Sequence, residues 1–201
     1  MVRAEQAGQR HSDLVLPMID AVLNEAGLRL VDLSGIAFGA GPGSFTGVRI
    51  ACGVAQGLAF GAGLQVAPVV TLVALAEAAG ASRVLTCLDA RMGEIYHAAY
   101  QRHEEEWDQV SPPVLCLPET SPDVAGDGWV GCGSGFDLYH QRLAAQLGTK
   151  LARVETGIYP HARCVARLGA AMLAAGKGVP AEQAVPLYVR DKVALKMGEP
   201  R

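Results

Sequence analysis

The sequence is poor in charge, in aromatic rings and in the motifs that mark catalytic or metal-binding proteins. Only 18% of its 201 residues are charged and the net charge is −3, so a clustered basic surface for holding nucleic acid is not expected. The five cysteines lie far apart with no CxxC pair, which suits free thiols better than a disulfide framework or a zinc cage. HExxH and GxSxG motifs are also missing from the sequence. The chain therefore specifies no active site of these kinds.

Apolar residues are abundant, and they make up half of the chain. The longest stretch without charge, residues 50–76, contains Gln56, Gln65, Pro68 and several glycines. It divides into helix, turn, strand and helix, whereas a membrane span needs about 20 consecutive apolar residues. The first residues lack the apolar core of a signal peptide. We therefore expect a buried segment of a globular protein, and no membrane partner.

The spacing of apolar residues predicts alternating helices and strands, which indicates an α/β fold with a seam near residue 80. Helices are expected over residues 12–26, from a cap at Ser44 or Thr46 to about Phe60, from a Thr71 cap to just before Gly80, near 136–147 and over 161–175. Strands are expected over residues 35–39, 66–70, 83–88, 94–100, around 114–117 and over 129–133. The third and fourth strands form a hairpin around residues 89–93, and a polar loop is expected at 102–108.

The densest motif is the glycine-rich loop that follows the first expected strand. Glycines between a strand and a helix leave backbone N–H groups free to face an anion. No lysine follows them as in a P-loop, and Thr46 stands where a dinucleotide fingerprint needs its third glycine. Gly41, Gly43 and Ser44 are the candidate cofactor contacts, and a purely structural tight turn is the competing interpretation.

The helix after this loop has no charged residue beyond Arg49, and small residues line two of its sides. One line holds Gly47, Ala51, Ala55 and Ala59, and the other holds Gly53, Gly57 and Gly61. A helix that is apolar all round must be covered all round, and its own sheet covers one side only. Either the rest of the chain covers the remainder or a partner does, and we favour a partner.

Few titratable residues are spaced for chemistry. Arg91 lies between Asp89 and Glu94, which favours a structural ion pair over an acid–base couple. His97 and His103 are six residues apart, so they do not share the helix face that metal-binding pairs use. We expect no catalytic residue and no metal site.

Four segments, in order, resemble the TsaB (YeaZ) family. They are His11-Ser12 with residues 16–20, the loop decapeptide 41–50, the Asp-Ala-Arg-Met-Gly-Glu turn at 89–94, and Pro-Leu-Tyr-Val-Arg at 186–190. The resemblance runs from about residue 9 to 194. The loop and the turn are highly specific together.

The resemblance implies a two-lobed actin-like, Hsp70-ATPase-like (ribonuclease H-like) α/β fold, with lobes at residues 1–80 and 81–201. It implies a bacterial cytoplasmic, non-catalytic subunit in the formation of threonylcarbamoyladenosine on tRNA. Its partners would be the transferase TsaD and TsaE, with tRNA met only through the complex and a homodimer possible alone. No tightly bound cofactor is implied, although ATP or ADP belongs to the complex. TsaD relatives hold a metal with a His-x-x-x-His pair, which this sequence lacks.

In the family, pairing with TsaD uses the helix-rich face of the N-terminal lobe. On this chain the resemblance assigns to that face His11, Met18, Arg49, Ala51, Gly53, Ala55 and Gly57. Family members usually begin with two strands and a phosphate-binding turn before the segment that matches Val2–Gln9, so we expect an incomplete N-terminal lobe. The alternative hypothesis is a nucleotide-dependent acyl or sugar kinase that uses the glycine loops at 39–47 and 131–135.

Overall fold

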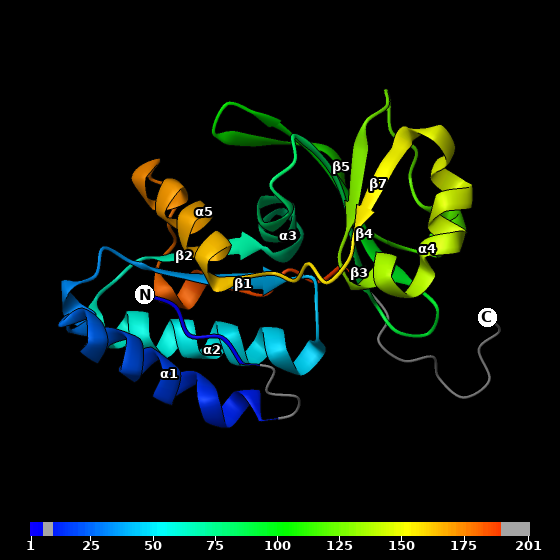
Figure 1. Cartoon of the computed structure of the whole chain (residues 1–201). Coiled ribbons are helices and arrows are strands. Elements are labelled where there is room, and N and C mark those ends of the chain that lie inside the picture. The colour runs from blue at the N-terminus through cyan, green and yellow to red at the C-terminus, as the bar shows by residue number, and fades with distance from the viewer. Residues whose placement is uncertain (6–9, 190–201) are drawn as a thin grey trace.

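Two sheets of different size organise the chain, as Figure 1 shows for the computed structural model, which describes residues 1–5 and 10–189. The smaller sheet pairs β1 (Ile36–Gly41) with β2 (Val66–Val70) in parallel. The larger sheet has the order β5-β4-β3-β6-β7. Its strands are β3 (Arg83–Asp89), β4 (Ile95–His103), β5 (Glu106–Cys116), β6 (Trp129–Cys132) and β7 (Leu151–Glu155). Short 3-10 turns lie at Leu30–Asp32, Pro118–Thr120, Gly148–Lys150 and Ala181–Gln183.

Helices cover both faces of the small sheet, because successive side chains of a strand point to opposite sides. The face with Phe38 packs against α2 (Phe45–Ala62), and α1 (His11–Ala26) lies alongside α2. The opposite face packs against α5 (Ala162–Ala174). A Cβ added to Gly169 would stand 2.3 Å from the Ala37 Cβ, so a glycine is what lets α5 approach this closely.

Helix α5 does not follow the expected division of the chain at residue 80. That division assigns residues 81–201 to the second lobe, but α5 packs on β1 and β2 of the first. The chain beyond it stays there, because Val179 forms an antiparallel bridge with Val66 and the Leu187 N–H donates to the Ala40 carbonyl. Nothing in the apolar spacing of α5 indicates which sheet it covers.

The larger sheet carries α4 (Ser134–Leu147) on one face and α3 (Thr71–Ala79) on the other. Phe136 and Leu143 of α4 are fully buried beside Trp129. Leu72 and Leu75 of α3 are fully buried against the opposite face. Because α3 also contacts β1, β2 and α5, this short apolar helix joins the two lobes.

Most elements lie where the sequence predicts them, but two predictions fail and one strand has no counterpart among the predictions. The polar loop expected at 102–108 is paired strand, because β4 continues to His103 and pairs with Glu106 of β5. Thr71 does not cap α3, whose cap is Val70, and its hydroxyl accepts the Gly41 N–H instead. Strand β7 was not predicted at all. Of the two residues predicted as possible caps of α2, Ser44 and Thr46, the structure has Ser44 as the cap, and its Oγ accepts the Gly47 N–H at 3.3 Å.

Helix α2 is long and apolar enough to cross a membrane by length and composition alone, within the residues that the structure describes. One such helix is weak evidence, because core helices of globular proteins meet the same criteria. In this structure Cys52, Ala55 and Ala59 of α2 are buried beside Phe38 and Val66 of the small sheet. The packing of α2 on its own sheet accounts for these buried residues, whereas Gly57 and Phe60 on its outward side stay exposed.

Candidate functional site

The glycine-rich loop ends β1 and turns the chain into α2 at the edge of the space between the lobes. Gly41 has a φ of 109°, and an added Cβ would stand 2.9 Å from the Leu187 carbonyl oxygen, so this position requires glycine. The peptide bond from Gly41 to Pro42 is cis. The Gly41 N–H donates to Thr71 Oγ1 at 3.0 Å. The loop is therefore held from α3 and from the returning C-terminal segment.

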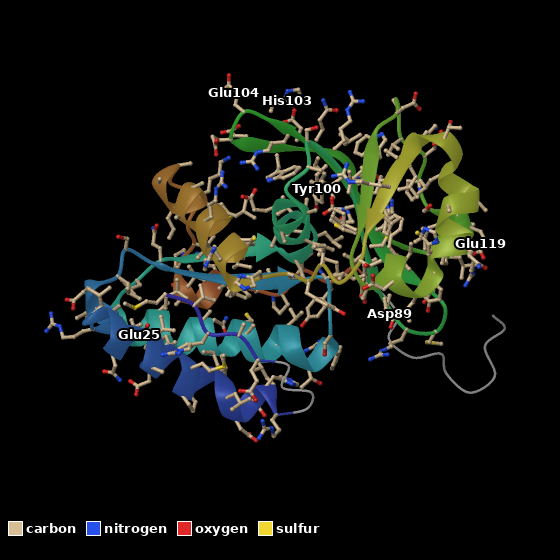
Figure 2. All side chains as sticks on the ribbon, viewed as in Figure 1. Glu25, Asp89, Tyr100, His103, Glu104 and Glu119 are labelled. Atoms are coloured by element: carbon tan, nitrogen blue, oxygen red, sulfur yellow. The ribbon has the colours of Figure 1, made fainter. Side chains whose placement is uncertain are left out.

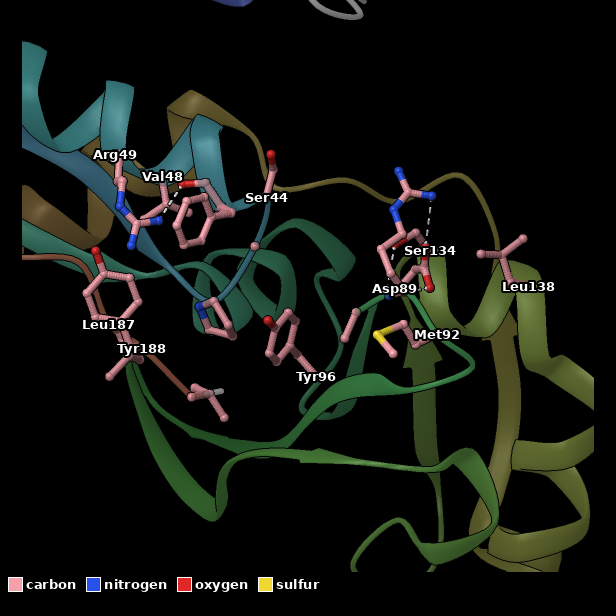
Figure 3. A pocket seen from close by; sticks show the side chains of 16 residues that line it. Ser44, Val48, Arg49, Asp89, Met92, Tyr96, Ser134, Leu138, Leu187 and Tyr188 are labelled. Atoms are coloured by element: carbon pink, nitrogen blue, oxygen red, sulfur yellow. Dashed lines mark hydrogen bonds and ion pairs between the residues drawn. The ribbon is translucent and has the colours of Figure 1, made fainter. Parts of the chain in front are cut away.

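A cleft of about 600 Å³ lies between the lobes at this loop (Figure 3). Both lobes and the C-terminal segment line it, with residues 42–45, Val48 and Arg49 from the loop and α2, residues 89–92 and Tyr96 from the β3–β4 hairpin, Ser134 and Leu138 from α4, and residues 187–189. Several of the apolar side chains are well exposed, Met92 at 71% and Leu138 at 62%. The lining therefore combines exposed apolar side chains with polar groups such as Asp89 and Arg49.

Two helices begin at this cleft, one from each lobe. Ser44 precedes α2, and Ser134 opens α4 directly after Gly133, whose φ is 99°. The positive end of each helix dipole lies at the cleft, where it would stabilise an anion. Ser134 Oγ also accepts the Asp89 N–H at 3.1 Å, which fixes the end of β3 against α4. The geometry can receive an anionic group without assigning chemistry to any side chain.

Asp89 is the carboxylate in the cleft, and its oxygens are engaged by neighbours. Its side chain is 12% exposed. Oδ1 accepts the Arg91 N–H at 3.0 Å and the Tyr139 hydroxyl at 3.3 Å, and Oδ2 lies 3.4 Å from Arg91 Nη1. Loss of hydration and the nearby Asp89 charge raise the pKa of Tyr139. The predicted ion pair between Asp89 and Arg91 is confirmed.

Arg49 supplies positive charge at the rim and joins α2 to the C-terminal segment. Its guanidinium lies 3.3 Å from the centre of the Phe45 ring and 4.8 Å from that of Tyr188. Arg49 Nη1 also donates to the Phe45 carbonyl at 3.0 Å. Arg49 therefore lines the cleft at the start of α2, and its assignment to the partner interface stays a prediction.

The two lines of small residues on α2 face different environments. Ala55 and Ala59 are 3% and 0% exposed in the core of the first lobe. Gly53, Gly57 and Gly61 point outward, and among the described residues no atom lies within 4 Å of where their Cβ atoms would stand. Ala55 therefore cannot touch a partner, which corrects its assignment to the interface.

The other predicted interface residues form one surface only in part. His11 and Met18 are half-buried on α1, and Ala51 is half-buried against the first-lobe core. Every residue of α1 keeps some surface exposed, and Phe60 at the far end of α2 is 79% exposed. We call the outward surface of α1 and α2, with Gly53, Gly57, Gly61 and Phe60, the helical face.

Sequence reasoning missed one residue that holds the glycine loop and one segment that lines the cleft. Thr71 was expected to cap a helix, and its bond to the glycine loop had no local signal. Leu187 and Tyr188 belong to a segment that was recognised as a motif, but its place beside Gly41 depends on the return of the chain. Arg190, the last residue of that motif, lies outside the described residues.

Metal ligands do not gather in the part of the chain that the structure describes, where no three His, Cys, Asp or Glu side chains are placed to share an ion. Burial raises the pKa of the Cys87 thiol, and it raises that of Cys116 to about 11 and that of Cys132 to about 12. These thiols remain protonated near neutral pH, so they are poor nucleophiles.

Comparison with known proteins gives consistent relatives across the chain. A sequence profile described as TsaD, tRNA N6-adenosine threonylcarbamoyltransferase, matches residues 2–196. The tRNA threonylcarbamoyladenosine biosynthesis protein TsaB of Escherichia coli is 40% identical over 96% of this chain and 86% of its own length. The protein of the same name from Haemophilus influenzae is 34% identical over 96% and 85%.

Solved structures give the same result. YeaZ from Pseudomonas aeruginosa is 39% identical, with a TM-score of 0.80 over 92% of this chain and 86% of its own. A second structure from that organism, described as an uncharacterized protein with similarity to peptidase YEAZ, has a TM-score of 0.81 and 38% identity, over 94% and 87% of the two chains.

Proposed function

This chain belongs to the TsaB (YeaZ) family, and from that premise we propose that it is a non-catalytic subunit in threonylcarbamoyladenosine formation on tRNA. Its curated relatives are named as tRNA threonylcarbamoyladenosine biosynthesis proteins, and its fold is the actin-like, ribonuclease H-like α/β fold of that family. The proposal adds that this chain acts by binding the transferase TsaD, that TsaE joins the pair, and that tRNA is met only through the complex, in the bacterial cytoplasm.

The observation that carries the proposal is the open glycine line of the helical face. Glycines spaced four residues apart let a second helix approach closely, so van der Waals contact extends along the whole line. Phe60 at its end offers a large exposed apolar side chain of the kind that anchors an interface. The same face can bind a second copy of this chain when TsaD is absent, which makes a homodimer part of the proposal.

A non-catalytic role is supported by the state of the reactive groups. Asp89 is engaged by Arg91 and Tyr139, and burial keeps the thiols of Cys87 and Cys132 protonated. In this proposal the cleft binds no nucleotide tightly in the isolated chain. ATP or ADP is bound at the level of the complex, where TsaD supplies the missing contacts.

Gly57→Glu tests the pairing. Glutamate is a better helix former than glycine by up to about 1 kcal/mol, and the site is open, so folding should not suffer. A charge on the helical face would be buried without a partner, so we expect the affinity for TsaD to fall at least 100-fold. Size-exclusion chromatography with light scattering, on the chain alone and mixed with TsaD, measures both the homodimer and the complex.

Ala145→Glu, an exposed position on α4, is the matched control and should pair normally. Pairing of Gly57→Glu at wild-type affinity would contradict the use of this face. Failure of the wild-type chain to bind TsaD at all would contradict the proposed partner.

The alternative function, a nucleotide-dependent acyl or sugar kinase, is favoured by one observation, the two helix N-termini at the cleft. Calorimetry of the isolated chain with ATP and magnesium separates the hypotheses. A kinase should bind ATP in the micromolar to millimolar range typical of substrates, whereas the accessory subunit should give no heat until TsaD is added.

A further inference from the structure

A polar cluster away from the cleft centres on Glu77, near the end of α3. Its side chain is only 6% exposed. The carboxylate accepts the Trp107 indole N–H at 2.8 Å and pairs with Arg167 Nη1 at 2.7 Å and Arg102 Nη1 at 3.5 Å. A nearly buried carboxylate is thus satisfied by three donors at once.

These donors come from both lobes. Arg102 and Trp107 face each other across the outer part of the β4–β5 hairpin, which we call the arm (residues 101–109), and the Arg102 guanidinium lies 5.5 Å from the Trp107 ring centre. Arg167 belongs to α5 of the first lobe. Glu105, in the turn of the arm, pairs with Arg102 at 3.3 Å and also with Arg167, which closes the ring of charges.

The arm reaches α5 at a distance from the cleft. Figure 2 shows His103 and Glu104 at its tip, at the opposite end of the second lobe from Asp89. The apolar contacts of α3 join the lobes close to their junction, whereas the pair of Glu105 with Arg167 joins the arm to α5 further out. A rotation of one lobe against the other would therefore displace the arm contact more than the α3 contact.

We propose that Glu77, Arg102, Trp107 and Arg167 form a latch that holds the arm on α5 and so fixes the angle between the lobes and the width of the cleft. Glu77 belongs to α3 and lies between the arm and α5, so separation of the arm from α5 would take this carboxylate, which water reaches poorly, either from Arg102 and Trp107 or from Arg167. Uncompensated buried charge is strongly unfavourable. The Glu105 pairs are more exposed and contribute less. Glu77 therefore bridges the arm to α5, and its bond to Arg167 is the side of that bridge that holds α5.

Trp107 reports directly on the latch, because Trp129, the other tryptophan, is 1% exposed and shielded from quenchers. We expect Arg167→Met to increase acrylamide quenching of tryptophan fluorescence at least twofold over wild type. Glu77→Gln, which loses the charge but keeps an oxygen for the indole, should increase it as well. Arg163→Met, on the same helix, is the matched control and should match wild type. Because the Arg167 side chain is 52% exposed, its variant should fold even if Glu77→Gln does not.

Lobe geometry needs a second measurement. Spin labels on ketone-bearing residues placed at Thr46 and Met92, both exposed and on opposite sides of the cleft, avoid the native cysteines. Electron–electron double resonance should give one narrow distance distribution in wild type and in Arg163→Met, and a distribution at least twice as wide in Arg167→Met. A distance distribution in Arg167→Met as narrow as that of wild type would overturn the latch, whether or not quenching changes. Any movement of the arm would then leave the angle between the lobes unchanged. Unchanged quenching in Arg167→Met would overturn it too.

Discussion

The two lobes are built from the same kinds of element, yet they bury very different side chains. The second lobe encloses Trp129, Phe136 and Leu143 between a five-stranded sheet and α4. The core of the first lobe rests on two strands and consists mainly of small residues such as Ala55 and Ala59 around Phe38. Large apolar side chains of the first lobe, Phe60 at 79% and Val31 at 56%, stay exposed instead. A lobe with so little internal burial leaves much of its apolar surface available to something outside the chain.

Truncating one phenylalanine in each lobe gives the largest contrast. Phe136→Ala should lower the free energy of unfolding by about 3–5 kcal/mol, because it opens a cavity in a fully buried core. Phe60→Ala should change it by no more than about 0.5 kcal/mol, because the ring is exposed. Urea unfolding measures both. Equal losses in the two variants would mean that the first lobe is packed as tightly as the second.

Acid should act on the second lobe through His97. This side chain is fully buried on β4, and among the described residues neither ring nitrogen has a hydrogen-bond partner. Burial lowers the pKa of His97 from 6.5 to about 4. Between these values the unfolded chain binds a proton that the folded chain does not, so stability falls as pH falls from 6.5 to 4. The loss amounts to about 3 kcal/mol at pH 4, at 1.36 kcal/mol for each pKa unit.

Urea unfolding at a series of pH values, followed by Trp129 fluorescence, measures this dependence. His97→Leu removes the titrating group at similar volume and should flatten the curve over the same range. A slope that persists unchanged in His97→Leu would assign the acid sensitivity to other groups.

The two serines at the cleft give a smaller loss than Phe136 or His97 and compare the lobes directly. Ser44→Ala removes the N-cap of α2 and should cost about 1 kcal/mol. Ser134→Ala leaves the Asp89 N–H without its acceptor and should cost about 1 kcal/mol as well. Hydrogen exchange locates each loss, and we expect the first turn of α2 to respond in one variant and the end of β3 in the other. Exchange that rises equally at both places in each variant would mean that the two sides of the cleft open together.

Local pattern was enough to predict the elements that have regular apolar spacing or a clear stop signal. Helix α1 ends before Gly27, and the hairpin of β3 and β4 has the expected five-residue connection. The arm escaped prediction because most of its residues, such as His103 and Glu106, are polar and exposed, and Trp107 is its one large apolar residue. Strand β7 is only five residues long, with Leu151, Ala152 and Val154 as its apolar residues, and it is stabilised by its pairing with β6, which the local sequence does not show.

The site was harder to predict than the fold, because it is assembled from distant segments. The glycine loop was found from its composition, but the bond from Gly41 to Thr71 joins residues 30 apart. On α2, composition could not distinguish the buried line of Ala55 from the open line of Gly57, since both are runs of small residues. The direction in which a small residue faces depends on where the sheet lies, and only the tertiary structure supplies that.

The return of α5 to the first lobe also sets an order of events during synthesis. Until residues 162–174 have left the ribosome, the face of β1 and β2 that they cover stays bare. At ~5–20 residues per second, the intervening residues 71–161 take on the order of ten seconds to make. Throughout that interval the newborn chain presents an apolar sheet face to chaperones and to other nascent chains. The lobe that is begun first is the one finished last.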